Sequence, residues 1–285
     1  MRRLSTSLAA TVLALALTPV PGASAAPQQE CPALVVLAAR GSEQNEDLRP
    51  TSYSDASPWV SNGYEERNIR AFLHFAESRH YAKTGESLLA DVQVLGLDDT
   101  VYPATFPVPA LAEQDENLDL PATAARVGGI LQQEPAHVIA QKAAEGLVGG
   151  LESGLNGTMG YVDAWESETG CHPGYLLVGF SQGAVVLIAQ EPELTRRGQL
   201  VGSLYFGNPL HALAAGRASG SNGLNYCADG DYVCNLTPGA AQAALRNGGG
   251  VHNRYFMDVD EQPTESDGHV ADRFAEWITG YTSRS

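Results

Sequence analysis

Three short, unbroken apolar stretches stand out along the chain, at residues 32–39, 174–180 and 200–206. Glycine or proline lies at or near the ends of each stretch. Runs of this kind are typical of parallel strands that are buried on both faces of a sheet. Two weaker stretches, 91–95 and 254–259, are further strand candidates.

The segments between these stretches favour helices. We predict helices at 65–81, 136–168, 182–190 and 270–278, the last with Asp267 as its cap. Strands that alternate with helices in this way predict an α/β fold with a parallel sheet. Ligands of such folds bind beyond the carboxyl ends of the strands.

Two segments follow strand candidates directly and therefore lie at that edge of the predicted sheet. Arg40-Gly41-Ser42 follows the first strong stretch, and Phe180-Ser181-Gln182 begins where the second one ends. The sequence therefore predicts a functional site where these two segments meet.

The first residues are typical of a secretory signal peptide. Two arginines follow the first methionine, an apolar run covers residues 8–17, and Ala23-Ser24-Ala25 provides an A-x-A cleavage site. A run of this length is too short to cross a bilayer, which needs about 20 apolar residues. We therefore expect residues 1–25 to be removed after Ala25 and one secreted domain to cover residues 26–285.

Charge narrows the class of partner. The 285 residues include 17 basic and 33 acidic side chains, which gives a formal net charge of −16. Such a chain is a poor partner for nucleic acids or anionic lipid head groups, because both attract clustered lysine and arginine. We expect a monomer with a neutral or apolar partner, and no later stretch is long enough to be a transmembrane segment.

Four cysteines in an exported chain favour two disulfides. Cys31, Cys171, Cys227 and Cys234 allow three pairings. A local loop that joins Cys227 to Cys234 would leave Cys31 for Cys171. Neither pair has the C-x2-C spacing of a zinc knuckle.

Residues 179–183 read Gly-Phe-Ser-Gln-Gly, which is a G-x-S-x-G motif. In this motif a nucleophilic serine lies on a tight turn from strand to helix, with small residues on both sides. Ser181 has the expected context, because an apolar strand candidate precedes it and helix-forming residues follow.

A serine nucleophile needs a base and an acid that orients the base. Downstream of Ser181, the acid candidates are Asp229 and Asp231, and the base candidates that follow them are His252 and His269. From the residues alone, both choices stay open.

Four segments together resemble the cutinase family of serine esterases, in its bacterial, actinobacterial-type branch. Residues 39–44 (A-R-G-S-x-Q) resemble the family's A-R-G-S-T-E segment, and residues 179–183 resemble its G-[YF]-S-Q-G motif. Residues 227–234 resemble its C-x2-G-D-x2-C loop, and residues 252–255 its H-x2-Y motif.

This resemblance implies a single-domain α/β-hydrolase fold, with a central, mostly parallel five-stranded sheet flanked by helices. It implies Ser181 as nucleophile, His252 as base and Asp231 as acid. It also implies an oxyanion hole made by Ser42 and by the backbone N–H of Gln182.

The same family pairs one disulfide around the acid and another between the starts of two strands. This implies the pairs Cys227–Cys234 and Cys31–Cys171.

The chain departs from compact fungal cutinases between Ser42 and Ser181, where it is longer. The additional residues are 50–63 and 106–170, where we expect an extra helical insertion. The insertion either forms a lid over the site or is a solvent-exposed addition with no role. The stretch before His252 is also longer than usual, which keeps His269 as the less favoured base. A histidine at the start of a helix is the weaker base, because the helix N-terminus disfavours the protonated ring.

The sequence therefore predicts a secreted carboxylic-ester hydrolase of cutinase, esterase or lipase type, with an acyl-enzyme intermediate. One alternative is a mycolyl-arabinogalactan-type or lysophospholipid esterase of the cell envelope, because residues 205–210 resemble the G-N-P-[ML] segment of the former. A remote alternative is a secreted binding protein without catalysis. We expect no metal and no cofactor, because the chain has no H-E-x-x-H, G-x-G-x-x-G or P-loop motif.

Overall fold

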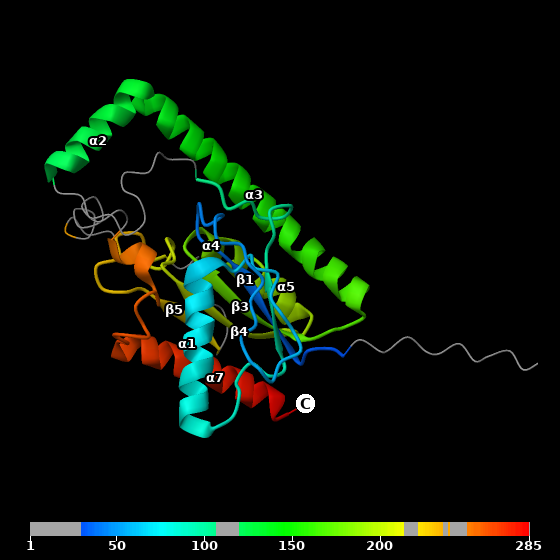
Figure 1. Cartoon of the computed structure of the whole chain (residues 1–285). Coiled ribbons are helices and arrows are strands. Elements are labelled where there is room, and N and C mark those ends of the chain that lie inside the picture. Colours follow the sequence, from blue (N-terminus) through cyan, green and yellow to red (C-terminus); the bar gives the residue numbers. More distant parts are fainter. Residues whose placement is uncertain (1–29, 107–119, 214–221, 236–238, 240–249, 285) are drawn as a thin grey trace, which may run out of the picture. The chain divides into compact units, whose positions relative to one another are not determined.

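A computed structural model of the chain describes residues 30–106, 120–213, 222–235, 239 and 250–284. Its five strands form one parallel sheet in the order β2-β1-β3-β4-β5, flanked by helices (Figure 1). The fold is therefore α/β, as predicted. The strands are β1 (Leu34–Ala39), β2 (Val92–Gly96), β3 (Gly174–Phe180), β4 (Leu200–Phe206) and β5 (Gly223–Tyr226).

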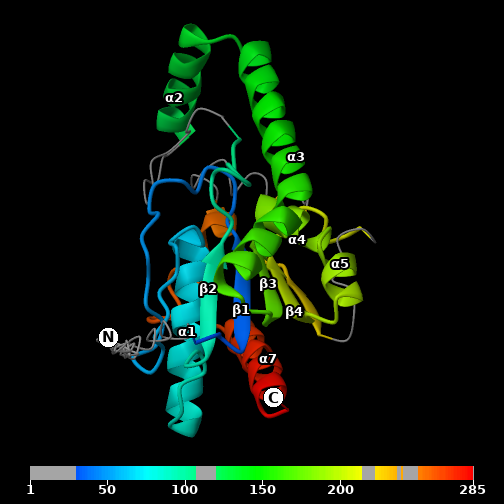
Figure 2. The same ribbon diagram turned by 90° about the vertical axis from the view of Figure 1, so that its right-hand side faces the viewer.

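The unbroken apolar runs exist because both faces of the sheet are covered. Val36 and Ala38 of β1 pack with α1 (Glu66–Thr84) and α7 (Glu265–Thr282). Val35 and Leu37 face the other way, toward α3 (Ala136–Thr169) and α4 (Gln182–Ile188). Figure 2 shows α1 on the left of the sheet and α4 on the right. Alternate side chains of one strand thus enter two separate cores.

The helical insertion consists of α2 (Leu120–Gln133) and α3. The sequence predicted α3 at 136–168, close to its observed bounds, but did not predict α2. The helix predicted at 182–190 ends at Ile188, and a separate short helix, α5 (Glu191–Arg196), follows it. Of the helices in the described ranges, none is long and apolar enough to cross a membrane.

The strand predicted at 254–259 is wrong. A 3-10 helix, η2 (Gly250–Arg254), ends there and a series of turns follows. Tyr255 and Phe256 are adjacent and both buried, whereas a half-buried strand would alternate. The fifth strand is β5 instead, whose four residues are all half-buried and carry no apolar run.

The last helix begins five residues earlier than predicted. Thr264 is its N-cap, and Asp267 lies one turn inside as the partner in a capping box. The expectation that Asp267 caps the helix is therefore corrected. His269 lies within the first turns of α7 and is exposed, rather than standing before the helix.

Two disulfides join the cysteines in the pairs that the resemblance implies. Cys31–Cys171, here called the long disulfide, closes a separation of 140 residues. Cys227–Cys234, the short disulfide, closes a separation of 7. The predicted signal peptide, residues 1–25, lies outside the described residues.

Candidate active site

Ser181 lies on the turn between β3 and α4, with φ 52° and ψ −121°. This backbone conformation is strained for a residue with a side chain, at a typical cost of about 1–3 kcal/mol. The chain holds it there partly through the Ser181 N–H, which donates to the Phe206 carbonyl at 3.0 Å. Gly183 permits the turn, because a Cβ at this position would lie 2.0 Å from the Ala39 carbonyl oxygen. The motif therefore does locally what its sequence predicted.

His252 comes from η2, and its Nε2 lies 2.9 Å from Ser181 Oγ. The ring is nearly buried and stacks on Phe180, with centroids 5.0 Å apart. Gly207 has φ +59°, and a Cβ there would lie 2.7 Å from His252 Cε1. The imidazole thus fills space that only a glycine at 207 leaves open.

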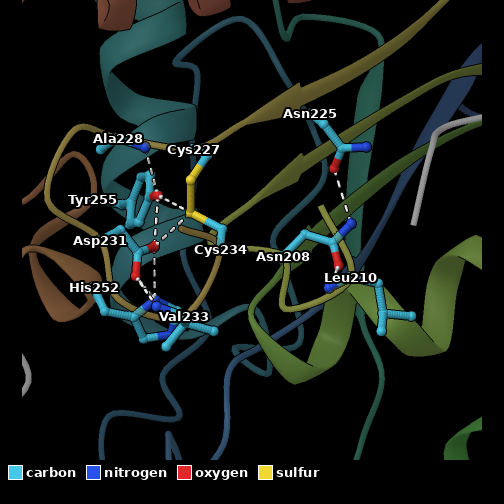
Figure 3. The surroundings of a disulfide bond; sticks show 10 residues. All are labelled: Asn208, Leu210, Asn225, Cys227, Ala228, Asp231, Val233, Cys234, His252 and Tyr255. Carbon is cyan, nitrogen blue, oxygen red and sulfur yellow. Dashed lines mark hydrogen bonds and ion pairs between the residues drawn. A yellow bond between two sulfur atoms is a disulfide. The ribbon is translucent and has the colours of Figure 1, made fainter. Parts of the chain in front are cut away.

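Asp231 lies on the other side of the ring and is fully buried. His252 Nδ1 is 3.1 Å from Asp231 Oδ1 and 3.0 Å from Oδ2 (Figure 3). Burial alone would raise the pKa of Asp231, but hydrogen bonds from His252, the Val233 N–H and Tyr255 outweigh burial and lower it. An ionised carboxylate only accepts, so Nδ1 carries the ring proton and Nε2 is left to accept from the Ser181 hydroxyl.

Tyr255 contributes hydrogen bonds as well as a buried ring. Its hydroxyl donates to Asp231 Oδ2 at 2.8 Å and accepts from the Ala228 N–H at 2.8 Å (Figure 3). Burial and the neighbouring carboxylate raise the pKa of Tyr255, so the hydroxyl keeps its proton. The tyrosine of the H-x2-Y motif therefore holds the Asp231 carboxylate in place beside His252.

The two choices that the sequence left open have different surroundings in the structure. Asp231 is buried inside the short disulfide loop, whereas Asp229 of the same loop is exposed. His252 lies between Ser181 and Asp231, whereas His269 is exposed on α7. The structure thus brings together Ser181, His252 and Asp231.

The two oxyanion candidates are also in contact. The Ser42 hydroxyl donates to Gln182 Oε1 at 2.9 Å, across a separation of 140 residues. Gln182 is the first residue of α4, where a backbone N–H has no partner within its own helix. Gln182 follows Ser181 in the sequence, and the hydrogen bond to Gln182 brings Ser42 next to Ser181 as well.

Arg40 holds the segment that carries Ser42. Its side chain is fully buried between the rings of Tyr64 and Tyr102. It donates to Asn45 Oδ1, to the Leu97 carbonyl and to Asp99 Oδ1 at 2.6–2.7 Å. The arginine of the A-R-G-S segment is therefore a structural residue rather than a substrate ligand.

The two surplus segments have different relations to the site. Residues 50–63 pack beside α1, where the Tyr53 hydroxyl donates to the buried Glu65 at 2.7 Å. In the second segment, the middle of α3 lies next to Gln182, whose Nε2 is 3.4 Å from the Leu147 carbonyl oxygen. Of residues 106–170, positions 107–119 lie outside the described part. Only the α3 portion is thus placed against a candidate site residue.

The Gly-Asn-Pro segment within 205–210 has structural uses. Gly207 makes room for His252, as described above. Asn208 is buried, donates to Asn225 Oδ1 at 3.0 Å and accepts from the Leu210 N–H at 2.9 Å (Figure 3). These contacts explain the segment without reference to a particular ester.

Among the described residues, no group of three or more His, Cys, Asp or Glu side chains is arranged to hold a metal ion. No family profile matches the chain, and no curated protein matches its sequence.

Solved structures do resemble it in fold. A cutinase-like protein from Cryptococcus sp. is 17% identical, over 90% of this chain and 98% of that one, with a TM-score of 0.40. A Trichoderma reesei cutinase in complex with a phosphonate inhibitor is 15% identical, over 88% and 78%, with a TM-score of 0.43. An acetylxylan esterase is 13% identical, over 87% and 100%, with a TM-score of 0.38.

The chain is similar in fold to these esterases. At such identities and TM-scores the similarity does not extend to substrate or mechanism. The function proposed below therefore rests on the side chains of this protein.

Proposed function

We propose that this protein is a secreted serine esterase that hydrolyses carboxylic esters through an acyl-enzyme. The observation that carries the proposal is the chain of contacts from Asp231 through His252 to Ser181, with the serine on a strained turn. A base within hydrogen-bonding reach of a hydroxyl, itself oriented by a carboxylate, is the arrangement that activates a serine.

In the first half of the reaction, Ser181 Oγ attacks the ester carbonyl carbon while His252 Nε2 takes the hydroxyl proton. The carbonyl oxygen becomes an oxyanion, which the Gln182 N–H and Ser42 would stabilise. The ester C–O bond then breaks, and the alcohol leaves with the proton from His252. The loss of one oxyanion donor typically costs about 3–4 kcal/mol of transition-state stabilisation.

In the second half, His252 takes a proton from water, and the resulting hydroxide attacks the acyl group on Ser181. The bond to Oγ breaks, and the serine recovers its proton from His252. Asp231 stays ionised throughout and stabilises the imidazolium that forms twice in each cycle. Its lowered pKa suits this role.

The ester itself is proposed only by class. A net charge of −16 favours a neutral or apolar substrate, such as a polyester, an acylglycerol or another aliphatic ester. Export after cleavage near Ala25, monomeric state and membership of the bacterial cutinase branch remain predictions from the sequence.

Hydrolysis of p-nitrophenyl esters tests the function directly. A fluorophosphonate should bond to Ser181, and Ser181→Ala should abolish this labelling and most turnover while leaving the fold intact. Near-wild-type turnover in Ser181→Ala would refute the mechanism. A wild-type protein that hydrolyses no ester and resists labelling would instead support a binding protein.

Two histidine variants test the base. His252→Ala should lose nearly all of kcat because its Nε2 is the group that faces Ser181, whereas His269→Ala should keep most of it. The matched comparison is the kcat of the two purified proteins. The reverse ranking would contradict the assignment of His252 but not the esterase function.

A series of acyl chain lengths separates the remaining classes. A preference for short chains would indicate an esterase of soluble substrates. A preference for long chains, with a rise in rate above the solubility limit, would indicate a lipase in which α3, which lies next to Gln182, acts as a lid.

A further inference from the structure

A chain of buried side chains joins the two loops that flank the candidate site. The Gly41 N–H, next to Ser42, donates to Gln44 Oε1 at 2.9 Å. Gln44 Nε2 donates to Asn68 Oδ1 at 2.5 Å. Asn68 is an early residue of α1, is fully buried, and belongs to neither loop.

The other end of the chain reaches the loop of His252. Asn68 Nδ2 donates to the Tyr255 carbonyl oxygen at 2.8 Å and to the Asn253 carbonyl oxygen at 3.2 Å. Asn253 follows His252 directly, and Tyr255 holds the acid. The amide group of Asn68 thus contacts two residues that lie 185 and 187 positions further along the sequence.

The order of donors and acceptors fixes how each amide points. Two backbone carbonyls can only accept, so the Asn68 Nδ2 must face them and its Oδ1 must face Gln44. Oδ1 in turn needs a donor, so Gln44 presents Nε2 to it and Oε1 to the Gly41 N–H. If either amide were flipped, an acceptor would face an acceptor or a donor would face a donor. This hydrogen-bond network therefore has only one arrangement.

We propose that Gln44 and Asn68 are positioning residues for the ester hydrolysis proposed above, because they set where Ser42 lies relative to His252. The inference rests on that proposed function. The oxyanion forms on the side of the substrate that faces Ser42 while the proton moves to His252. The loops that carry these two residues must therefore keep a fixed position relative to each other during this step. A misplacement of about 1 Å costs roughly 10²-fold in rate in reactions of this kind.

The resemblance to cutinases places an acidic residue where this chain has Gln44, and the difference suits the network. A carboxylate at this position could still accept from the Gly41 N–H. Its second oxygen would then face Asn68 Oδ1, and two acceptors would oppose each other. The amide is the group that both accepts from one loop and donates toward the other.

Isosteric variants cut one link each. Gln44→Glu breaks the link to Asn68, and Asn68→Asp turns an oxygen toward the two carbonyls of the histidine loop. We expect each to lower kcat by about 10- to 100-fold, with KM for p-nitrophenyl butyrate unchanged within about twofold. If Asn68→Asp does not fold, Gln44→Glu, which leaves the backbone contacts of α1 intact, is the deciding variant.

The matched control is Asn62→Asp. Asn62 bridges to the Gly96 backbone, donating to its carbonyl at 2.7 Å and accepting from its N–H at 2.8 Å, on a segment that carries no site residue. We expect Asn62→Asp to lower the Tm by an amount comparable to Asn68→Asp but to keep kcat within about twofold. A loss of kcat that merely follows Tm in all three variants would overturn the proposal.

A double variant gives the second readout. If Asn68 acts through the placement of Ser42, then Ser42→Ala combined with Asn68→Asp should lose less kcat than the product of the two single losses. A fully multiplicative loss would refute this coupling. Failure of the wild type to hydrolyse any ester would refute the proposed function instead, so the two outcomes are distinct.

Discussion

Removal of a single oxygen atom at Tyr255 should weaken the fold in a way that depends on pH. Tyr255→Phe keeps the ring that packs on Phe206 and Phe256 but deletes the hydroxyl. The variant thereby loses the hydrogen bond to Asp231 and leaves the Ala228 N–H without its acceptor.

The structure sets the size of the effect. A hydrogen bond to a charged group contributes about 1.5–3 kcal/mol, and an unsatisfied buried donor costs about 1–3 kcal/mol. Ala228 is only half-buried, so water can hydrogen-bond to its N–H and reduce the penalty for the unsatisfied donor. We therefore expect Tyr255→Phe to lower the free energy of unfolding by about 2–4 kcal/mol near pH 7.

The sign of the pH dependence follows from Asp231. Its pKa is lowered in the folded protein, so its ionised form contributes stability above the unfolded pKa of about 3.9. That contribution is lost as the pH falls through the folded pKa. Removal of the tyrosine donor raises the folded pKa, so the deficit of the variant is full near neutral pH and shrinks in acid.

Urea unfolding at several pH values from 7 to 3 measures this deficit. Tyr226→Phe is the matched control, because its hydroxyl donates to Asp267 at 3.0 Å outside the candidate triad. The control should lose stability but keep kcat, whereas Tyr255→Phe should lose both. A deficit at Tyr255 that is equal at every pH would refute a bond to an ionised carboxylate, and no deficit would refute the bond altogether.

Two further predictions concern the room around His252 and the two disulfides. Gly207→Ala should lower kcat by about 10²-fold, because its Cβ would lie 2.7 Å from His252 Cε1 and would push the imidazole away by about 1 Å. A crystal structure of the variant with His252 in place, together with a normal kcat, would contradict this. Loss of the long disulfide should cost about 5 kcal/mol and loss of the short one about 2 kcal/mol by chain entropy. Only the short one should lower kcat at temperatures where both variants are folded, because it encloses Asp231; equal losses of kcat would argue against that role.

Much of the fold could be predicted from local sequence. The strands β1, β3 and β4 appear as nearly unbroken apolar runs because both of their faces are buried, which leaves little place for polar residues such as Ser203 of β4. The turn at Ser181 was also predicted, from the G-x-S-x-G motif, and the structure explains Gly183 of that motif because a Cβ there would lie 2.0 Å from the Ala39 carbonyl oxygen. The strands could be recognised from burial alone, and the turn from the five residues of its own motif.

The edge of the sheet could not be predicted in the same way. All four residues of β5 are half-buried, so its sequence differs little from that of a loop. The stretch 254–259 looked more like a strand because Tyr255, Phe256 and Val259 are apolar. Those side chains are buried because they pack on one face of the sheet and on the helices that cover it, not because they belong to a strand.

The sequence by itself determined the α/β class, the strong strands, the turn at Ser181 and a short set of candidate partners for it. Tertiary structure decided which partners meet, because Asp229 and Asp231 share a loop and differ only in which one the packed chain buries. It alone revealed the link through Gln44 and Asn68, whose residues lie far apart in sequence. Periodicity and motif spacing in a sequence reflect local burial and backbone conformation. Hydrogen bonds between distant loops form only when the sheet and α1 bring those loops together.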